Sequence, residues 1–302
     1  MKKTDRPPRR RDPVDGVLLL DKPQGISSNA ALQRARNALG AAKAGHTGTL
    51  DPMATGLLPL AFGESTKFSQ TLLDADKGYE ATVQLGVTTT TGDAEGDVLD
   101  RKPAAFSADE IRAAALAFVG EVEQLPPMFS ALKHAGKPLY AYAREGIDIE
   151  RKRRRVTIHS LDCEPIGPDG FVMRVRCSKG TYIRTLAEDI GSRLGCGAHL
   201  TALRRTEIGP FAIESAVALD AVEAATLDDA RALLAPVDCL IGALPVLNLD
   251  EMRSRQLCHG QTVALDGVAA GSYRVYLADR FLGLGRVDNA SVLSSQRLVV
   301  TN

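Results

Sequence analysis

The segment GHTGTLDPMATG, residues 45–56, is the most unusual stretch of this 302-residue chain. Its three glycines permit backbone angles and close approaches that a side chain forbids. Pro52 keeps the backbone of Asp51 out of the helical region, so this carboxylate lies on a stiffened turn near His46. A catalytic carboxylate needs such positioning, although an ordinary turn beginning at Asp51 would carry the same pattern. The glycine and proline content predicts a loop over residues 45–59.

A second group of chemically capable residues lies in KGTYIR, residues 179–184. If a helix begins near Thr181, its first backbone N–H groups can face an anion. Arg184 would then lie about one turn into the helix, where its planar guanidinium could bind both oxygens of Asp51. The alternative is a capped helix with Arg184 on its surface. Tyr79 presents a similar choice, because its ring could stack on a nucleobase or lie in the interior.

Hydrophobic periodicity elsewhere predicts a mixture of strands and helices. We expect strands over Val14–Asp21, Tyr79–Val87, Val156–Pro165, Phe171–Cys177 and Leu200–Ile208. We expect helices over Ser28–Leu39, Glu64–Leu73, Ser107–Val119, Tyr182–Leu194 and an acidic stretch ending near Leu234. Residues 88–97 form a polar loop. The elements lack the regular alternation of a doubly wound sheet, so the fold class is α+β with a mixed sheet.

The chain divides into three regions. Residues 1–13 hold six Lys or Arg and three prolines, which predicts a disordered basic arm. Such an arm could bind RNA or serve only as a solubility tail. Residues 14–243 form the main body. Residues 246–302 form a small β-rich unit with one short helix and strands over Tyr273–Leu277, Phe281–Val287 and Leu298–Val300.

The charges are balanced in number and segregated in position. Lys and Arg total 37, and so do Asp and Glu. Residues 133–155 carry a net charge of +5 and residues 174–207 of +4, whereas 74–123 and 214–251 carry −7 each. A charge run is usually a solvated face, but two basic stretches together with a basic arm are consistent with binding a phosphate backbone.

Several classes of protein are disfavoured by composition. The apolar runs are too short to cross a bilayer, and the basic N-terminus is not followed by the apolar stretch of a signal peptide. The five cysteines form no C-x-x-C motif and no zinc-ligand spacing. We therefore expect a reduced cytoplasmic protein with buried thiols, no metal and no membrane contact.

Six motifs in sequence order resemble the TruB family of tRNA pseudouridine synthases. They are DKPQGISS at 21–28, GHTGTLDPMATGLLP at 45–59, Tyr79, SALK at 130–133, SKGTYIRTLAEDIG at 178–191 and CGAHLTALRR at 196–205. The resemblance covers about residues 14–210. The tail after Pro245 resembles the PUA-type RNA-binding domain of these enzymes. The resemblance implies a pseudouridine-synthase fold with a mixed, mostly antiparallel sheet.

The resemblance also implies roles for individual residues. Asp51 would be the catalytic aspartate, Arg184 would pair with it, and Tyr79 would stack on the target uracil. Whether Asp51 attacks C1′, adds to C6 or removes a sugar proton stays open. His46 would contact the RNA loop that the flipped base leaves. The remaining residues expected to bind substrate are Tyr182, Leu203, Lys22, Lys133 and Lys179.

The function implied by the resemblance is the conversion of uridine 55 in the T-arm of tRNA to pseudouridine, without a cofactor. We expect a monomer that needs neither a protein partner nor a guide RNA. One alternative is a chaperone that binds and folds RNA without catalysis, and this role could coexist with the reaction. Another is a guide-dependent synthase of the H/ACA type.

Overall fold

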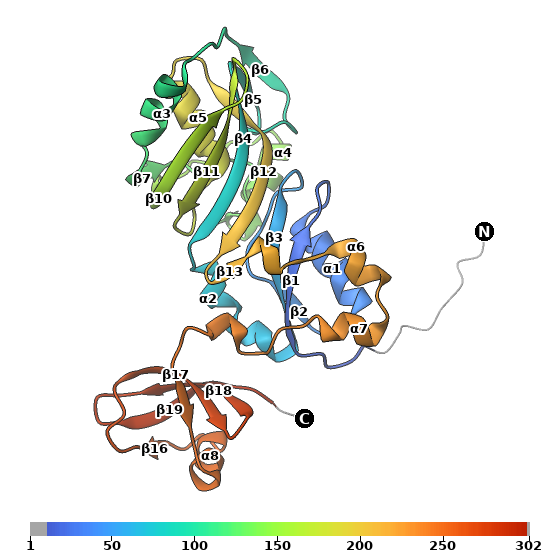
Figure 1. The fold of residues 1–302 in the computed structure, drawn as a ribbon, viewed down its shortest axis with the longest axis vertical. Coiled ribbons are helices and arrows are strands. Elements are labelled where there is room, and N and C mark those ends of the chain that lie inside the picture. Colours follow the sequence, from blue (N-terminus) through green and yellow to red (C-terminus); the bar gives the residue numbers. More distant parts are fainter. Residues whose placement is uncertain (1–10, 301–302) are drawn as a thin grey trace, which may run out of the picture.

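The computed structural model describes residues 11–300, and within this range the strands form one large sheet, one small sheet and two separate strand pairs (Figure 1). The large sheet has ten strands: β1 (Gly16–Lys22), β2 (Ala44–His46), β3 (Thr55–Phe62), β4 (Lys77–Leu85), β7 (Gly120–Gln124), β10 (Arg154–Pro165), β11 (Gly170–Cys177), β12 (Ala198–Ile208), β13 (Phe211–Ala212) and β14 (Val217–Ala218). The main path runs β14-β1-β3-β12-β4-β11-β10-β7. The β1–β14 and β3–β12 pairs are parallel, whereas β1–β3, β4–β12, β4–β11 and β10–β11 are antiparallel. The predicted α+β fold with a mixed, mostly antiparallel sheet is confirmed.

Three helices supply the main core together with the sheet: α1 (Ser28–Ala38), α3 (Ala108–Leu116) and α5 (Ile183–Arg193). Contacts join α5 to β12 and α3 to β10. Two of the helix starts follow from capping residues. The side chain of Ser27 accepts from the backbone N–H of Ala30, and Ser107 forms a capping box with Glu110. The sequence predicted both starts correctly.

A second apolar cluster covers the opposite face of β1 and β3. Val17, Leu57 and Ala61 pack there against Phe68 and Ile241. Strand β3 is thus buried on both faces, which explains its unbroken apolar sequence. The predicted loop over residues 45–59 was therefore too long, because β2 and β3 occupy its two ends. The glycines and the two prolines of this stretch concealed both strands.

Three other segments differ in detail from the helices and the loop that the sequence predicts. The helix expected over Glu64–Leu73 is a 3-10 helix at Gly63–Phe68 followed by α2 (Ser69–Leu73). The acidic stretch holds two short helices, α6 (Leu219–Ala224) and α7 (Leu227–Ala232), because Ala225 is extended and Thr226 caps the second helix. The expected loop over residues 88–97 begins inside β5 (Val87–Thr89), which pairs with β6 (Val98–Arg101).

The small sheet lies at the far end of the molecule, next to the C-terminus (Figure 1). Its strands are β15 (Val246–Asn248), β16 (Val263–Ala264), β17 (Gly271–Leu277), β18 (Arg280–Val287) and β19 (Val292–Leu298), accompanied by α8 (Glu251–Cys258). The predicted strand Leu298–Val300 was wrong, because the last strand precedes it. Leu293 is the one fully buried residue of β19, so the strand has little hydrophobic alternation to reveal it.

Buried contacts attach the small sheet to the main body. Arg274 donates to the carboxylate of Asp238 at 2.8 Å, and the hydroxyl of Tyr276 donates to the same group. Phe281 packs edge-on against Phe68, with ring centroids 5.8 Å apart. Lys67 also donates to the carbonyl oxygen of Leu298 at 2.7 Å. A fixed orientation between the two parts follows from these contacts.

Three further predictions can be compared with the structure. Residues 1–10 of the predicted arm lie outside the described range, whereas Asp12 pairs with Ala41 and bonds Arg231, so the arm is ordered by that point. Three cysteines are buried, but Cys239 is half-buried and Cys258 is exposed, so the expectation of buried thiols was wrong for these two. Between residues 11 and 300, no helix combines the length and apolar character needed to cross a membrane.

Gly56→Ala should destabilise the protein. Gly56 has φ +102°, and a Cβ atom there would lie 2.3 Å from the carbonyl oxygen of Arg205 on the adjacent strand. We expect the free energy of unfolding in urea to fall by about 1–3 kcal/mol. The control is Gly45→Ala, where a Cβ atom would meet nothing within 4 Å and the expected change is within about 0.5 kcal/mol. Equal effects of the two changes would contradict the packing described here.

Candidate active site

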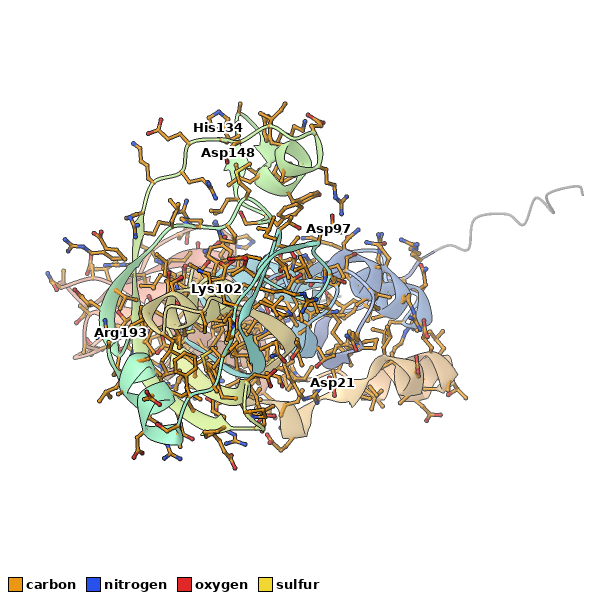
Figure 2. The ribbon with its side chains drawn as sticks, turned by 90° about the horizontal axis from the view of Figure 1, so that it is seen from above. Asp21, Asp97, Lys102, His134, Asp148 and Arg193 are labelled. Carbon is orange, nitrogen blue, oxygen red and sulfur yellow. The ribbon has the colours of Figure 1, made fainter. Side chains whose placement is uncertain are left out.

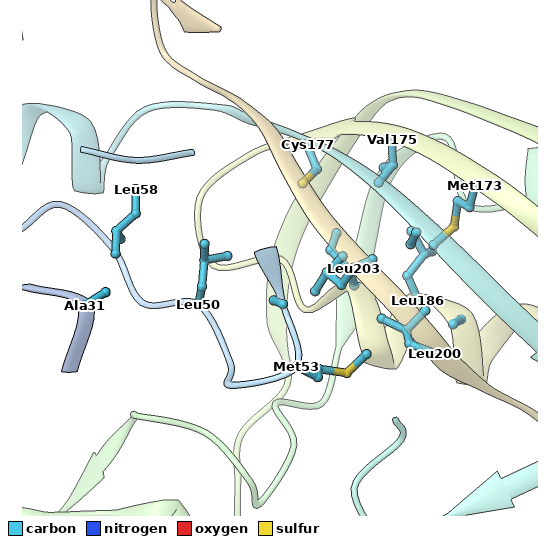
Figure 3. Packing of buried hydrophobic residues seen from close by; sticks show 14 of the residues in the cluster. Ala31, Leu50, Met53, Leu58, Met173, Val175, Cys177, Leu186, Leu200 and Leu203 are labelled. Carbon is cyan, nitrogen blue, oxygen red and sulfur yellow. The ribbon is translucent and has the colours of Figure 1, made fainter. Parts of the chain in front are cut away.

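The loop between β2 and β3 holds Asp51 between two buried anchors. Leu50 and Met53 point into the main core near Leu203 (Figure 3). The hydroxyl of Ser28 accepts from the backbone N–H of Leu50 at 2.7 Å and donates to its carbonyl oxygen at 3.0 Å. The backbone N–H of Ala54 donates to the carbonyl oxygen of Asp51, which closes a turn. The Asp51 carboxylate is therefore held at the tip of a rigid loop, with 34% of its side chain exposed.

Arg184 is the partner of this carboxylate. Its Nη2 lies 3.0 Å from Oδ2 of Asp51 and donates to the carbonyl oxygen of Phe129 at 2.7 Å. Its Nη1 donates to the carbonyl oxygen of Thr91 at 2.8 Å. Only 5% of the side chain is exposed, so the alternative of a surface arginine is wrong. The expected two-oxygen pairing is also wrong, because the other donors bind backbone carbonyls.

The helix that carries Arg184 starts one residue later than expected. Tyr182 is its N-cap residue, and Gln124 of β7 holds the backbone of Tyr182 at both ends. The side-chain oxygen of Gln124 accepts from the Tyr182 N–H at 2.9 Å, and its nitrogen donates to the Tyr182 carbonyl at 3.2 Å. Thr181 thus lies outside the helix. The position of the Arg184 side chain is therefore held at both ends, by the fixed backbone at the start of α5 and by the hydrogen bonds of its guanidinium.

Asp93 is a site residue that the sequence did not reveal. Its Oδ2 lies 3.5 Å from Nη1 of Arg184, and 4% of its side chain is exposed. The hydroxyl of Thr91 and the backbone N–H of Glu95 both donate to its other oxygen. Asp93 belongs to a run of polar residues that predicts a solvated loop. The short-range Thr-x-Asp hydrogen bond was the available signal, but it is common in exposed turns as well.

Burial dominates the electrostatics of Asp51. Loss of water raises the pKa of its carboxyl group, and Arg184 and Lys22 oppose that rise while Asp93 adds to it. The net direction is upward, because the loss of water outweighs the two cations. An aspartate of raised pKa is a stronger base than an exposed one. The arrangement suits a carboxylate that reacts.

A cavity of about 310 Å³ opens next to this pair. Five residues expected at the site line it: Asp51, Tyr79, Tyr182, Arg184 and Leu203. They come from the loop between β2 and β3, from β4, from the start of α5 and from β12, which are distant in sequence. Ser130 also lines the cavity, and its buried hydroxyl has no partner. The cavity therefore combines a carboxylate, aromatic rings and an unused hydroxyl.

Lys22 is placed differently from the expectation. It is completely buried, so contact with substrate is not available to it in this structure. Its ammonium donates to the carbonyl oxygens of Pro23, Ile26 and Pro52, the last directly following Asp51. Burial lowers its pKa to about 8, and Asp51 opposes the shift. Lys22 therefore fastens the catalytic loop to the end of β1.

The other expected residues lie outside the cavity lining. His46 ends β2 with a buried Nδ1 that has no partner, and burial and the nearby Arg205 lower the pKa of its ring. Lys133 is exposed on a hairpin formed by β8 (Lys133–His134) and β9 (Lys137–Pro138). Lys179 is exposed and lies 2.8 Å from Asp74. The structure leaves both lysines accessible.

Three family descriptions match almost the entire chain. Residues 36–183 match "TruB family pseudouridylate synthase (N terminal domain)", residues 184–241 match "tRNA pseudouridylate synthase B C-terminal domain", and residues 245–299 match "Pseudouridine synthase II TruB, C-terminal". Two similar proteins are both named tRNA pseudouridine synthase B. That from Aromatoleum aromaticum is 59% identical over 95% of this chain and 94% of its own length. That from Burkholderia mallei is 57% identical over 98% and 97%.

Solved structures support the same relationship. One is described as "Structure of H/ACA RNP bound to a substrate RNA containing 2'-deoxyuridine", with a TM-score of 0.72 and 25% identity over 100% of this chain and 92% of that chain. A Cbf5-Nop10-Gar1 complex matches with a TM-score of 0.67 and 28% identity over 96% and 85%. The large mixed sheet and the separate small sheet are thus shared with known proteins.

Lys22→Met should remove a dependence of stability on pH. The pKa of Lys22 lies near 8 in the folded protein and near 10.5 when exposed, so the unfolded chain binds more protons between these values. The wild-type free energy of unfolding, relative to that of Lys22→Met, should therefore rise by about 3 kcal/mol from pH 7.5 to 10.5. Denaturant unfolding at several pH values measures this difference. Lys133→Met, which removes an exposed lysine, should follow the wild type. A pH profile of Lys22→Met parallel to that of the wild type would contradict the buried contacts.

Proposed function

Because the chain belongs to the TruB family of pseudouridylate synthases, we propose that it converts uridine 55 in the T-arm of tRNA to pseudouridine. The observation that carries the proposal is the contact between Asp51 and the buried Arg184 at the edge of an open cavity. The names of the relatives support tRNA as the substrate. The motif resemblance adds the T-arm and the position of the uridine.

The reaction needs what this cavity supplies. It breaks the glycosidic bond from N1 to C1′ and forms a bond from C5 to C1′, while C5 loses a proton and N1 gains one. No electrons are transferred, and the reaction requires no redox cofactor. Asp51 would act on the nucleotide by attack at C1′, addition to C6 or removal of a sugar proton. Arg184 would keep its carboxylate oriented during each of these steps.

The target base must leave its stack to reach Asp51. Tyr79 would stack on the flipped uracil, and Tyr182 and Leu203 would enclose the nucleotide, because all three line the cavity. His46 would contact the RNA that the base has left. Its lowered pKa supports a neutral ring that can accept or donate a hydrogen bond.

Exposed basic residues beside the cavity support RNA docking. Residues 152–155 are exposed at the start of β10, and the charge of Arg154 reaches Tyr182, whose pKa it lowers against a larger rise from burial. His134 and Asp148 mark a part of the chain that projects from the body (Figure 2). Lys133 lies on the same hairpin as His134 and would contact the substrate there. We propose that RNA phosphates bind residues 152–155 and the hairpin that carries Lys133. Lys179 would also contact the substrate, and the PUA-like unit, residues 246–302, would form a second RNA contact.

The proposed enzyme works as a cytoplasmic monomer without an obligatory partner. The chain covers 94–97% of two relatives named as tRNA pseudouridine synthases, which supports an activity contained in one polypeptide. Activity on purified tRNA alone would separate this proposal from a guide-dependent synthase. A purely structural RNA chaperone would bind tRNA and leave the uridine unchanged.

Asp51→Asn should abolish the reaction. We expect wild-type protein to release tritium from tRNA labelled at uracil C5, with no other protein or RNA added, and Asp51→Asn to be slower by at least about 10³-fold. Binding of tRNA by the variant should stay within a few-fold of wild type. Asp109→Asn makes the same chemical change at an exposed position on α3 and should leave the rate unchanged. Inactive wild-type protein, or full activity of Asp51→Asn, would refute the proposal.

Arg154→Gln should weaken tRNA binding through a lost phosphate contact. The slope of log Kd against log salt concentration should decrease by about 0.7–0.9. The rate at saturating tRNA should stay within about twofold of wild type, because Arg154 lies outside the cavity lining. Arg34→Gln is the matched control, since Glu223 and Asp220 already pair with Arg34. An unchanged slope for Arg154→Gln would place the RNA elsewhere.

A further inference from the structure

Arg205 is a deeply buried cation that the proposed chemistry does not use. It is 1% exposed, and its Nε donates to the carbonyl oxygen of Leu57 at 2.7 Å. Among residues 11–300, no carboxylate lies within salt-bridge distance of its guanidinium. Its Nη2 is buried without any hydrogen-bond partner. An unpaired charge in the interior destabilises the folded protein. Its presence therefore points to a function for Arg205.

The sheet places Arg205 directly behind the candidate site. In the antiparallel pairing of β12 with β4, Arg205 lies opposite Tyr79, so both side chains leave the same face of the sheet. Leu203, two residues earlier on β12, leaves that face as well and lines the cavity with Tyr79. A Cβ atom on Gly48 would lie 3.4 Å from Nη1 of Arg205. The guanidinium therefore lies between Tyr79 and the catalytic loop.

Lys77, His46 and Tyr79 all lie near the guanidinium, whose charge lowers the pKa of Lys77 and of His46 and so opposes their protonation. A neutral His46 ring could still accept through its unpartnered Nδ1, but Tyr79 is the residue that lies directly opposite Arg205 on the neighbouring strand. Burial raises the pKa of the Tyr79 phenol, and the charge of Arg205 opposes that rise. A hydroxyl oxygen can accept from a guanidinium, whereas the ammonium of Lys77 offers no acceptor.

We propose that Arg205 is a positioning residue for the isomerisation: its Nη2, which has no partner in this structure, donates to the Tyr79 hydroxyl when the target base stacks on that ring, and so fixes the ring. The inference rests on the function proposed above. Arg205 itself is too deeply buried to touch RNA. Its influence on the reaction must therefore pass through Tyr79.

A double-mutant cycle tests this route. Pseudouridine formation is measured under single-turnover conditions for the wild type, Arg205→Met, Tyr79→Phe and the double variant. We expect Arg205→Met to slow the reaction by about tenfold or more in the wild type and by less than about twofold in Tyr79→Phe. The affinity for tRNA should stay within about twofold in all four proteins. Rate losses that multiply in the double variant would overturn the inference.

Two further variants separate positioning from structural damage. Lys77→Met removes another buried cation, which donates to the carbonyl oxygens of Leu72, Leu73 and Ala75, and should leave the rate of the folded protein unchanged. Arg205→Lys retains the charge and should retain more activity than Arg205→Met. A loss of rate in Lys77→Met equal to that in Arg205→Met would assign both effects to general damage and overturn the inference.

A measurement without any Arg205 variant covers the case in which none folds. In protein labelled with ¹⁵N-arginine and bound to tRNA, the Arg205 side-chain resonances of the wild type and Tyr79→Phe are compared by NMR. A shift caused by loss of the hydroxyl supports the contact, and identical resonances overturn it. Failure of the proposed function is distinguishable, because the wild type would then form no pseudouridine. Failure of this inference leaves the wild type active.

Discussion

The buried guanidinium of Arg184 is the constraint on which the rest of the site depends. Its donors are satisfied by Asp51, Phe129 and Thr91, and Asp93 lies close by. A buried cation that loses these partners is costly, so the segments that supply them must meet around it. They come from the catalytic loop, the β5–β6 connection and the segment before β8. One side chain therefore ties together three loops that sequence separates widely.

Two further buried cations, Lys22 and Arg205, lie near the loop that carries Asp51. Lys22 holds the carbonyl oxygens around the catalytic loop, and Arg184 holds its carboxylate. Arg205 lies on the neighbouring strand, behind Tyr79. Each cation is fixed by main-chain carbonyl oxygens, and this leaves Asp51 the one partly exposed charge of the group. Burial, the cations Arg184 and Lys22 and the carboxylate of Asp93 together set how readily that carboxylate gives and takes a proton.

Much of the fold was predictable because it follows from local signals. Capping residues located α1 and α3, and alternation located β4, β10, β11 and β12. The failures share a cause, since tertiary packing overrode the local pattern. Strand β3 carries glycine and proline but is sheathed on both faces, and β19 is polar but paired. Asp93 lies in a stretch whose composition is that of a solvated loop, yet the chain folds it inward.

The residues proposed to carry the chemistry could be picked out from the sequence, because a carboxylate on a proline-stiffened turn and an arginine at a helix start are encoded within a few positions. The sequence also determined the family, through motifs in a fixed order. How these residues meet depends on the three-dimensional packing. The sharing of Arg184 with Asp93, the burial of Lys22 away from RNA and the placement of Arg205 behind Tyr79 depend on strand register and on desolvation, which arise between segments and leave no mark in any one of them.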